Sequence, residues 1–301
     1  MPAYEFVTVD VFTDRRFGGN PLAVFPEARG LSDADMQALA TEFNLSETSF
    51  ILPPDNPQHT ARVRIFTPRT ELPFAGHPNV GTGYVLARRL QHRPEHFTFE
   101  EGSGLVRVRI ERGPDGQPSG ARIAAPHSLR IGIDVPPDLP ASCGGLAMAD
   151  IATEAHHPLV AGVGVDFLIA EVADPTILTS AACDPVAFRQ AAQRVPELGS
   201  FALCLYARQD GDATRLRIRV FAPFHGTMED PATGSAAAAL AALLTSLAPG
   251  DNVDLAYDVE QGEEMGRPSR LFATGRKEAE GPVTATVAGS CVPVMTGSVG
   301  L

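Results

Sequence analysis

The chain has 301 residues, 44% of them hydrophobic and 20% charged, a composition typical of a globular protein long enough for two domains. Its formal net charge of -12 at pH 7 argues against nucleic acid or an anionic membrane as a partner, because such binding depends on clustered Lys and Arg. Neither a long apolar run nor the pattern of a signal peptide occurs, so we expect a cytoplasmic protein with no membrane partner.

The motifs of common metal and cofactor sites are missing from the sequence. The four cysteines form no C-x-x-C pair, which argues against a zinc ribbon or a redox dithiol. The single lysine, Lys277, lies in a loop-like segment unsuited to a buried Schiff base, and no phosphate-binding G-x-x-x-x-G-K-[ST] loop occurs. Adjacent His156 and His157 would point to opposite faces of a strand, so we assign them no metal. We therefore expect neither a metal nor a cofactor.

In chain order, the first half is predicted to consist of strands and two helices. Alternating apolar residues predict strands at 4–12 and 61–66. Ser32 begins a predicted helix, because it is a good N-cap and acidic residues and helically spaced apolar residues follow it. The segment 81–90 (GTGYVLARRL) predicts the second helix of this half.

The second half is predicted to follow the same plan. Strands are expected at 166–172 and 215–221, a helix from Gly234, and two short strands at 283–289 and 292–297. A proline-rich segment after the first half favours a domain boundary near residue 127. We thus predict domains at 1–127 and 128–301, with about the last ten residues free to return to the first domain.

An internal repeat links the two halves. The segment RVRIFTP at 62–68 recurs as RIRVFAP at 217–223, an offset of 155 residues, and SFIL at 49–52 matches SFAL at 200–203. Each half then runs through a loop into a glycine-containing helix start. Two similar α+β units usually leave a cleft between them, and such clefts are common sites for small molecules.

The two helix starts are candidate anion sites. One carries Gly76 and His77, and the other carries Gly234 and Ser235 with Asp230 just upstream. Free N–H groups and the helix dipole attract an anion, and glycine allows close approach. The alternative is that Thr233 and Ser235 are only N-caps and that Asp230 only compensates the helix dipole. Duplication of the motif favours binding of an acidic small molecule.

Five segments together resemble the PhzF-like phenazine biosynthesis protein family, which is similar in fold to diaminopimelate epimerase and proline racemase. They are GGNPLAVF, NLSETSFIL, LPFAGHPNVGTGYVL, EDPATGSAAAALAALL and QGEEMGRPSRL. The resemblance implies an α+β fold of two pseudo-symmetric domains, each a barrel-like and mostly antiparallel sheet around a central helix. It also implies an active site between the domains and a homodimer.

The resemblance further indicates which residues carry the chemistry. The epimerases and racemases use two cysteines, which we match to Ala75 and Ala232, so the sequence excludes a thiol racemase. In the PhzF-like family the proton carrier is the glutamate of the SET segment, here Glu47, and the SFIL–SFAL match places Leu198 at its equivalent. The duplicated halves therefore retain a single carboxylate, that of Glu47, as the expected proton carrier.

The other site residues are assigned by the same resemblance. His77 and Asp230 are expected to place or relay the proton, and the helix dipole should keep the imidazole of His77 neutral. Gly76, Gly234 and Ser235 match the substrate-holding helix starts. Asn20 and Arg267 also match family motifs, but turn formation and packing explain them equally well, and we assign them no role.

These residues favour a cofactor-independent isomerase with a single glutamate as acid and base. Such a group can take a proton from one carbon and return it to another, provided that an enclosed site raises its pKa. The expected substrate is a small unsaturated carboxylate similar to trans-2,3-dihydro-3-hydroxyanthranilate, the best-known substrate of the family. The alternative is a non-catalytic small-molecule-binding or scaffold protein on the same fold. Retention of Glu47, His77 and Asp230 together disfavours it.

Overall fold

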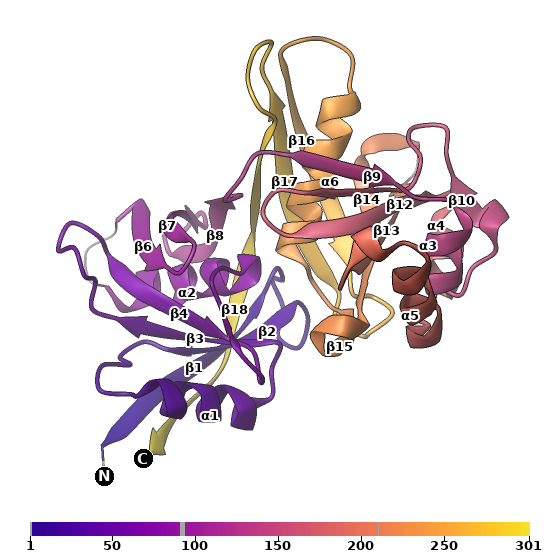
Figure 1. Cartoon of the computed structure of the whole chain (residues 1–301). Coiled ribbons are helices and arrows are strands. Elements are labelled where there is room, and N and C mark those ends of the chain that lie inside the picture. Colours follow the sequence, from indigo (N-terminus) through magenta and orange to yellow (C-terminus); the bar gives the residue numbers. More distant parts are fainter. Residues whose placement is uncertain (1, 91–93, 210) are drawn as a thin grey trace. The chain divides into compact units, whose positions relative to one another are not determined.

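The computed structural model describes residues 2–90, 94–209 and 211–301. The chain forms two compact units: unit 1 comprises Met1–Pro126 and Ala288–Leu301, and unit 2 comprises His127–Val287. The long strand β18 (Thr284–Gly300) begins in unit 2 and ends in unit 1, where both chain termini lie (Figure 1). The two short strands predicted at 283–289 and 292–297 are thus wrong, because β18 continues through both segments.

Unit 1 is a barrel around one helix. Within the described residues eight strands pair in a ring, because β18 pairs with β1 at one end of the series and with β8 at the other. The pairs β2–β3 and β4–β6 are parallel. A short strand, β5 (Glu71–Leu72), pairs with β4. The ring runs in the order β1 (Ala3–Val11), β2 (Asn20–Phe25), β3 (Glu47–Leu52), β4 (Ala61–Phe66), β6 (His96–Glu101), β7 (Gly104–Arg112), β8 (Pro118–Ala124) and β18.

Helix α2 (Gly76–Arg89) fills this barrel, and its glycines set how closely the strands approach. A Cβ on Gly81 would lie 2.6 Å from Cδ2 of Leu22, and one on Gly83 would lie 2.7 Å from Cγ1 of Val108. Such distances are shorter than van der Waals contact, so any larger residue would push the strands apart. The GTG segment therefore permits the central helix to sit inside so small a barrel.

Unit 2 repeats the arrangement around α6 (Gly234–Leu247). The helix is buried over nearly its whole surface, as expected for a run of alanine and leucine that is apolar all round. Two short strands, β10 (Ile151–Ala152) and β15 (Thr227–Asp230), pair with β12 (Asp166–Val172) and β14 (Asp212–Ala222) respectively. The principal strands are β9 (Arg130–Asp134), β11 (Leu159–Gly162), β12 (Asp166–Val172), β13 (Ala202–Gln209), β14 (Asp212–Ala222), β16 (Val253–Gln261), β17 (Ser269–Lys277) and the first part of β18.

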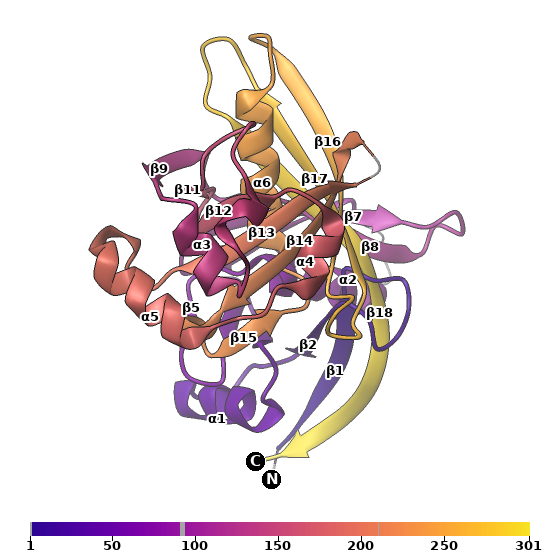
Figure 2. The same cartoon turned by 90° about the vertical axis from the view of Figure 1, so that its right-hand side faces the viewer.

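The remaining helices pack on the outer faces of the strands. In unit 1, α1 (Asp33–Phe43) buries Met36 and Leu39 against a cluster of phenylalanines, and Ser32 caps it as predicted. In unit 2, α3 (Asp138–Cys143), α4 (Pro175–Ser180) and α5 (Pro185–Arg194) lie outside β12, β13 and β14 (Figure 2). Three short 3-10 helices, Met148–Asp150, Pro196–Leu198 and Pro223–His225, complete the described elements. None of the helices in the described ranges is both long and apolar enough to cross a membrane.

The strand register defines how the two units correspond. Strands β3 and β4 align Ser49 with Ile65, whereas β13 and β14 align Cys204 with Val220. Ile65 and Val220 are equivalent in the 155-residue repeat, so Ser49 corresponds to Cys204 and Glu47 to Ala202. The predicted match of Glu47 with Leu198 is therefore wrong, because the short SFIL–SFAL similarity is out of register with the sheet. Ala202 carries no proton either, so the register leaves Glu47 without an acidic counterpart.

Candidate functional site

Glu47 and His77 lie together at one end of the unit 1 barrel. Glu47 is the first residue of β3, and His77 is the second residue of α2. Oε2 of Glu47 lies 3.5 Å from Nε2 of His77, and the side chains are 17% and 7% exposed. The structure thus places a carboxylate and an imidazole within reach of the same small group, beside the predicted substrate-binding Gly76.

The imidazole of His77 is neutral. Burial lowers the pKa of His77 from 6.5 to about 3, so the ring carries no charge near neutral pH. We predicted neutrality from the helix dipole, and burial acts in the same direction. A neutral ring does not stabilise the Glu47 carboxylate as a counter-ion would, and it can still donate or accept a hydrogen bond. The contact is therefore suited to placing a proton.

Asn20 supports the start of β3. It is fully buried, and its Oδ1 accepts a 2.9 Å hydrogen bond from Oγ of Ser46, the residue before Glu47. Gly19 has a φ of +61°, and a Cβ there would lie 2.2 Å from the carbonyl oxygen of Val11, so only glycine fits before Asn20. Asn20 thus ties the Glu47 segment to β2. The GGNP motif singled out Asn20, but the contact with Ser46 could not be predicted because the two residues are 26 positions apart in the sequence.

Buried polar atoms gather near the start of α2. Within the described residues, Nε2 of His77, Oδ1 of Asn79 and both carboxyl oxygens of Glu101 are buried and have no hydrogen-bond partner. Oγ1 of Thr48 is a further such atom, and it belongs to the other face of β3 from Glu47. A buried polar atom left unsatisfied costs about 1–3 kcal/mol, and such atoms are rare in folded proteins. Their concentration here marks a polar site.

The starts of α2 and α6 differ from those of three outer helices, α1, α4 and α5. Side chains of Ser32, Asp174 and Asp184 cap α1, α4 and α5. In contrast, the N-caps of α2 and α6, Ala75 and Thr233, make no capping hydrogen bond among the described residues, and neither first turn contains an acid. The positive ends of the two central helices are therefore not compensated in this way, which favours an anion.

Unit 2 brings Asp230, Gly234 and Ser235 together at the start of α6. Oγ1 of Thr233 donates a 2.5 Å hydrogen bond to Oδ2 of Asp230. The buried Gln261 donates from Nε2 to the carbonyl oxygen of Asp230 at 2.7 Å, and its Oε1 accepts from the Thr233 N–H at 2.9 Å. Gln261 therefore holds the turn that carries Asp230. In the sequence Gln261 appears only as the first residue of the QGEEMGRPSRL segment, and we predicted no role for it.

The helix boundaries correct one predicted equivalence. The residue before the first glycine is Ala75 in α2 and Thr233 in α6, and Ala232 stands one position earlier. Ala75 therefore corresponds to Thr233, and the predicted match of Ala75 with Ala232 is wrong by one residue. Threonine has no thiol, so the exclusion of a two-cysteine racemase is unchanged.

Arg267 belongs to a tight turn in unit 2. Its N–H donates to the carbonyl oxygen of Gly262 at 3.0 Å, and its own carbonyl oxygen accepts from Oγ of Ser269 at 2.9 Å. Oγ of Ser269 also donates to the carbonyl oxygen of Pro231 at 2.9 Å. The turn thus packs against the segment between Asp230 and α6, which gives the MGRPS motif a supporting part in this unit.

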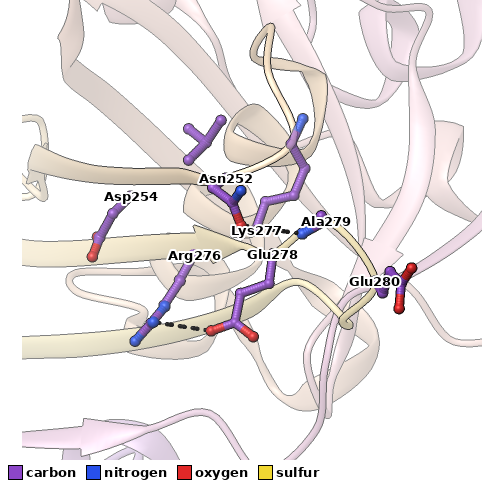
Figure 3. A pocket seen from close by; sticks show the side chains of 8 residues that line it. Asn252, Asp254, Arg276, Lys277, Glu278, Ala279 and Glu280 are labelled. Carbon is purple, nitrogen blue, oxygen red and sulfur yellow. Dashed lines mark hydrogen bonds and ion pairs between the residues drawn. The ribbon is translucent and has the colours of Figure 1, made fainter.

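A surface pocket of about 530 Å³ lies elsewhere in unit 2, at the loop ends of β16 and β17 (Figure 3). Arg276 forms an ion pair with Glu278 at 2.9 Å there, and Lys277 donates to the carbonyl oxygens of Ser246 and Ala248. These cations therefore serve contacts within the protein. None of the predicted site residues lines this pocket. Among the residues the structure describes, no group of three or more His, Cys, Asp or Glu is arranged for a metal.

Comparison with known proteins identifies the family. The family model described as "Phenazine biosynthesis-like protein" matches residues 9–297. An uncharacterized isomerase of Mesorhizobium japonicum is 37% identical over 301 residues, 99% of each chain. The trans-2,3-dihydro-3-hydroxyanthranilate isomerase of Pseudomonas chlororaphis is 33% identical, covering 98% of this chain and 99% of that protein. The crystal structure of a PhzF-family phenazine biosynthesis protein from Bacillus anthracis has a TM-score of 0.87 over all of both chains at 24% identity.

The structural likeness shows the fold, and the names of the two relatives support an isomerase. The family model and both relatives extend over nearly the whole sequence, with the internal repeat and both helix starts included. The chain belongs to the phenazine biosynthesis-like protein family.

Proposed function

We propose that this protein is a cofactor-independent isomerase that moves a proton within a small unsaturated carboxylate, with Glu47 as acid and base. The observation that carries the proposal is the 3.5 Å contact between Oε2 of Glu47 and Nε2 of His77, at the uncapped start of α2. A binding or scaffold protein has no need of a carboxylate beside a buried neutral imidazole, because each polar group buried there lowers stability.

The reaction follows from having one carboxylate. The Glu47 carboxylate takes a proton from one carbon of the substrate, and the electrons of the broken C–H bond shift through the adjacent double bond. The resulting carboxylic acid then returns the proton to the far carbon of the conjugated system. The atoms and charge balance without a redox partner. Because Ala202 occupies the register position equivalent to Glu47, a second carboxylate of the same kind is not supplied by the repeat.

The remaining residues would bind and orient the substrate. Gly76 and His77 begin α2, and Gly234 and Ser235 begin α6, each with N–H groups suited to a carboxylate. Asp230, held by Thr233 and Gln261, would place or relay the proton. We also propose that the protein works as a homodimer.

The name of one relative supports the substrate class that we propose. Trans-2,3-dihydro-3-hydroxyanthranilate is the substrate in the name of the Pseudomonas chlororaphis relative, and it is the first compound to test here. Its carboxylate suits a helix N-terminus, and its conjugated ring suits proton transfer between carbons.

The Glu47→Gln variant tests the proposal, because glutamine keeps the shape but cannot ionise. We expect isomerisation to fall at least about a hundredfold to ten-thousandfold, while ligand affinity and the melting temperature change little. Glu42→Gln, the same change at an exposed position on α1, is the matched control and should keep the wild-type rate.

Isotope transfer tests the single carrier separately. With a substrate deuterated at the carbon that loses its proton, one carboxylate should carry part of the label to the new carbon, whereas two separate groups would lose it to water. A Glu47→Gln variant near the wild-type rate would refute the proposal. If the wild-type protein bound these carboxylates without turnover, the binding-protein alternative would be favoured.

A further inference from the structure

Glu101 is the last residue of β6 and faces the interior of unit 1. Its neighbour Glu100 points to the other side of the strand, where it accepts hydrogen bonds from the N–H groups of Asp55 and Asn56 and contacts His59. These donors lower the pKa of Glu100 to about 2, whereas burial raises the pKa of Glu101 to about 8. Adjacent glutamates thus have opposite environments, and the proposed reaction uses neither of them.

The repeat gives Glu101 a counterpart in unit 2. Parallel strands β4 and β6 align Arg62 with Glu100, and parallel strands β14 and β16 align Arg217 with Glu260. Arg62 and Arg217 are equivalent in the 155-residue repeat, so Glu100 corresponds to Glu260. The next residue in each strand is Glu101 in unit 1 and Gln261 in unit 2.

The residues that follow confirm this correspondence. Gly102 follows Glu101, and a Cβ on it would lie 3.1 Å from Cα of Pro73. Gly262 follows Gln261, and a Cβ on it would lie 2.5 Å from the carbonyl oxygen of Pro231. Each proline precedes the first glycine of the central helix by three positions. Both strand ends therefore pack against the same part of their unit.

The two residues also face the same kind of structure. Gln261 holds the start of α6 through hydrogen bonds to Asp230 and Thr233. Glu101 lies next to Asn79 of α2, whose Nδ2 donates a 3.0 Å hydrogen bond to the carbonyl oxygen of the N-cap residue Ala75. A contact between Glu101 and Asn79 would therefore help to hold the start of α2, because the same Asn79 amide binds the carbonyl oxygen of Ala75.

The hydrogen bonds that Glu101 can make favour its neutral form. Oδ1 of Asn79 and both carboxyl oxygens of Glu101 are buried and have no partner of ordinary geometry within the described residues. Oδ1 can only accept, and a carboxylate has no hydrogen to donate, whereas a carboxylic acid has one. The second Nδ2 hydrogen of Asn79 can be donated to either form of Glu101. Only the protonated form can also donate to Oδ1, as the amide of Gln261 both donates and accepts in unit 2.

We propose that Glu101 is a positioning residue for the start of α2, which acts as a neutral carboxylic acid through Asn79 and is the unit 1 counterpart of Gln261. The effect on catalysis rests on the proposed function, whereas the protonation of Glu101 does not. Ionised Glu101 has no hydrogen to donate and places a buried negative charge beside Asn79. Asn79 follows Gly76, where a substrate carboxylate would bind, by about one helical turn.

The expected change in KM with pH is assigned to the proton of Glu101, because the neighbouring groups described next do not titrate in this range. The register partner of Glu101 on β7 is Gly104, which has no side chain. The facing group on α2 is the uncharged amide of Asn79. This amide lowers the pKa of Glu101 by less than burial raises it. His77 lies two residues before Asn79 on α2, and with a pKa of about 3 it stays neutral throughout this range.

The Glu101→Gln variant tests the proposal, because it copies the residue that unit 2 uses. In the wild-type protein, infrared spectroscopy should show the band of a protonated carboxyl group that disappears with a midpoint near pH 8 and is missing from Glu101→Gln. With trans-2,3-dihydro-3-hydroxyanthranilate, the wild-type KM should rise about tenfold per pH unit above this midpoint. Glu101→Gln should keep the wild-type kcat at pH 7 and lose this alkaline rise in KM.

Two further variants complete the test. Glu100→Gln removes a carboxylate from the same strand and should leave the band and the alkaline rise in place. Glu101→Leu cannot donate to Asn79 and should lower kcat at pH 7 at least about tenfold, which Glu101→Gln does not. A missing band at pH 7, or an unchanged alkaline rise in Glu101→Gln, would overturn the proposal. If the compound is not turned over at all, the proposed function fails, and the infrared band still decides the state of Glu101.

Discussion

Oγ of Ser49 and Oγ1 of Thr82 lie 2.7 Å apart in a buried hydrogen bond that joins β3 to α2. Ser49 follows Glu47 by two positions and faces the same side of the strand, and Thr82 lies in the middle of the helix that begins with Gly76 and His77. The two elements that bring Glu47 to His77 are thus linked inside the barrel by a pair of hydroxyl groups.

The losses from removing the two hydroxyls should not be additive. Ser49→Ala or Thr82→Val leaves a buried hydroxyl without its partner, so each should lower the free energy of unfolding by about 1–3 kcal/mol. The double variant should lose less than the sum of the two, because no hydroxyl remains unsatisfied. Urea unfolding of the four proteins measures the coupling. Strictly additive losses would show that the hydrogen bond does not join the two elements.

Asn20→Ala should slow isomerisation without changing any residue that touches the substrate. Loss of the hydrogen bond from Ser46 frees the segment before Glu47, and a small displacement of an acid/base group can reduce a rate by about a hundredfold. We expect a fall in kcat of about tenfold to a hundredfold. Asn20→Asp, which keeps an oxygen acceptor for Ser46, should lose less. Equal activity of wild type and Asn20→Ala would contradict the supporting role of Asn20.

His77 should make the protein sensitive to acid. The folded pKa of about 3 lies below the ordinary value of 6.5, so between these pH values the unfolded chain binds a proton that the folded chain does not. The free energy of unfolding should therefore fall as the pH drops from 6.5 towards 3, by at most about 1.4 kcal/mol per pH unit from this residue. Urea unfolding at pH 7, 5 and 4 measures the slope.

The matched variants separate His77 from other titrating groups. His77→Asn cannot take up a proton and should show a smaller loss between pH 7 and 4 than the wild-type protein. His96→Asn removes an imidazole whose side chain is 47% exposed and should keep the wild-type slope. Identical slopes in wild type and His77→Asn would show that the imidazole is not buried in its neutral form.

Much of the fold follows from local patterns in the sequence. The alternation in RVRIF and the apolar run after Gly234 predict strands and a buried helix, because these periods reflect which side chains face the core. The recurrence of RVRIFTP as RIRVFAP predicts two similar units, and both the parallel pairs and the central helices repeat in the structure. The family motifs singled out Glu47 and His77, which lie in contact.

Register between strands could not be found from the same patterns. A four-residue similarity such as SFIL and SFAL satisfies the strand period in more than one alignment, and only hydrogen bonding to the next strand shows that Ala202, not Leu198, corresponds to Glu47. Likewise, the strand β18 runs through both segments that we predicted as separate strands, and the local pattern did not show that it stays extended past Gly289 and Ser290 to pair with β1 from Cys291 onwards.

The sequence by itself determined which residue types were available: one glutamate in the SET segment, no thiol at either helix start, and a repeated plan in two halves. Only the tertiary structure decided what each of them experiences. Glu100 and Glu101 are adjacent and chemically identical, yet one meets backbone N–H groups and the other is buried against α2. A pKa depends on the solvent and charges that surround a group, and folding brings these from residues distant in the sequence.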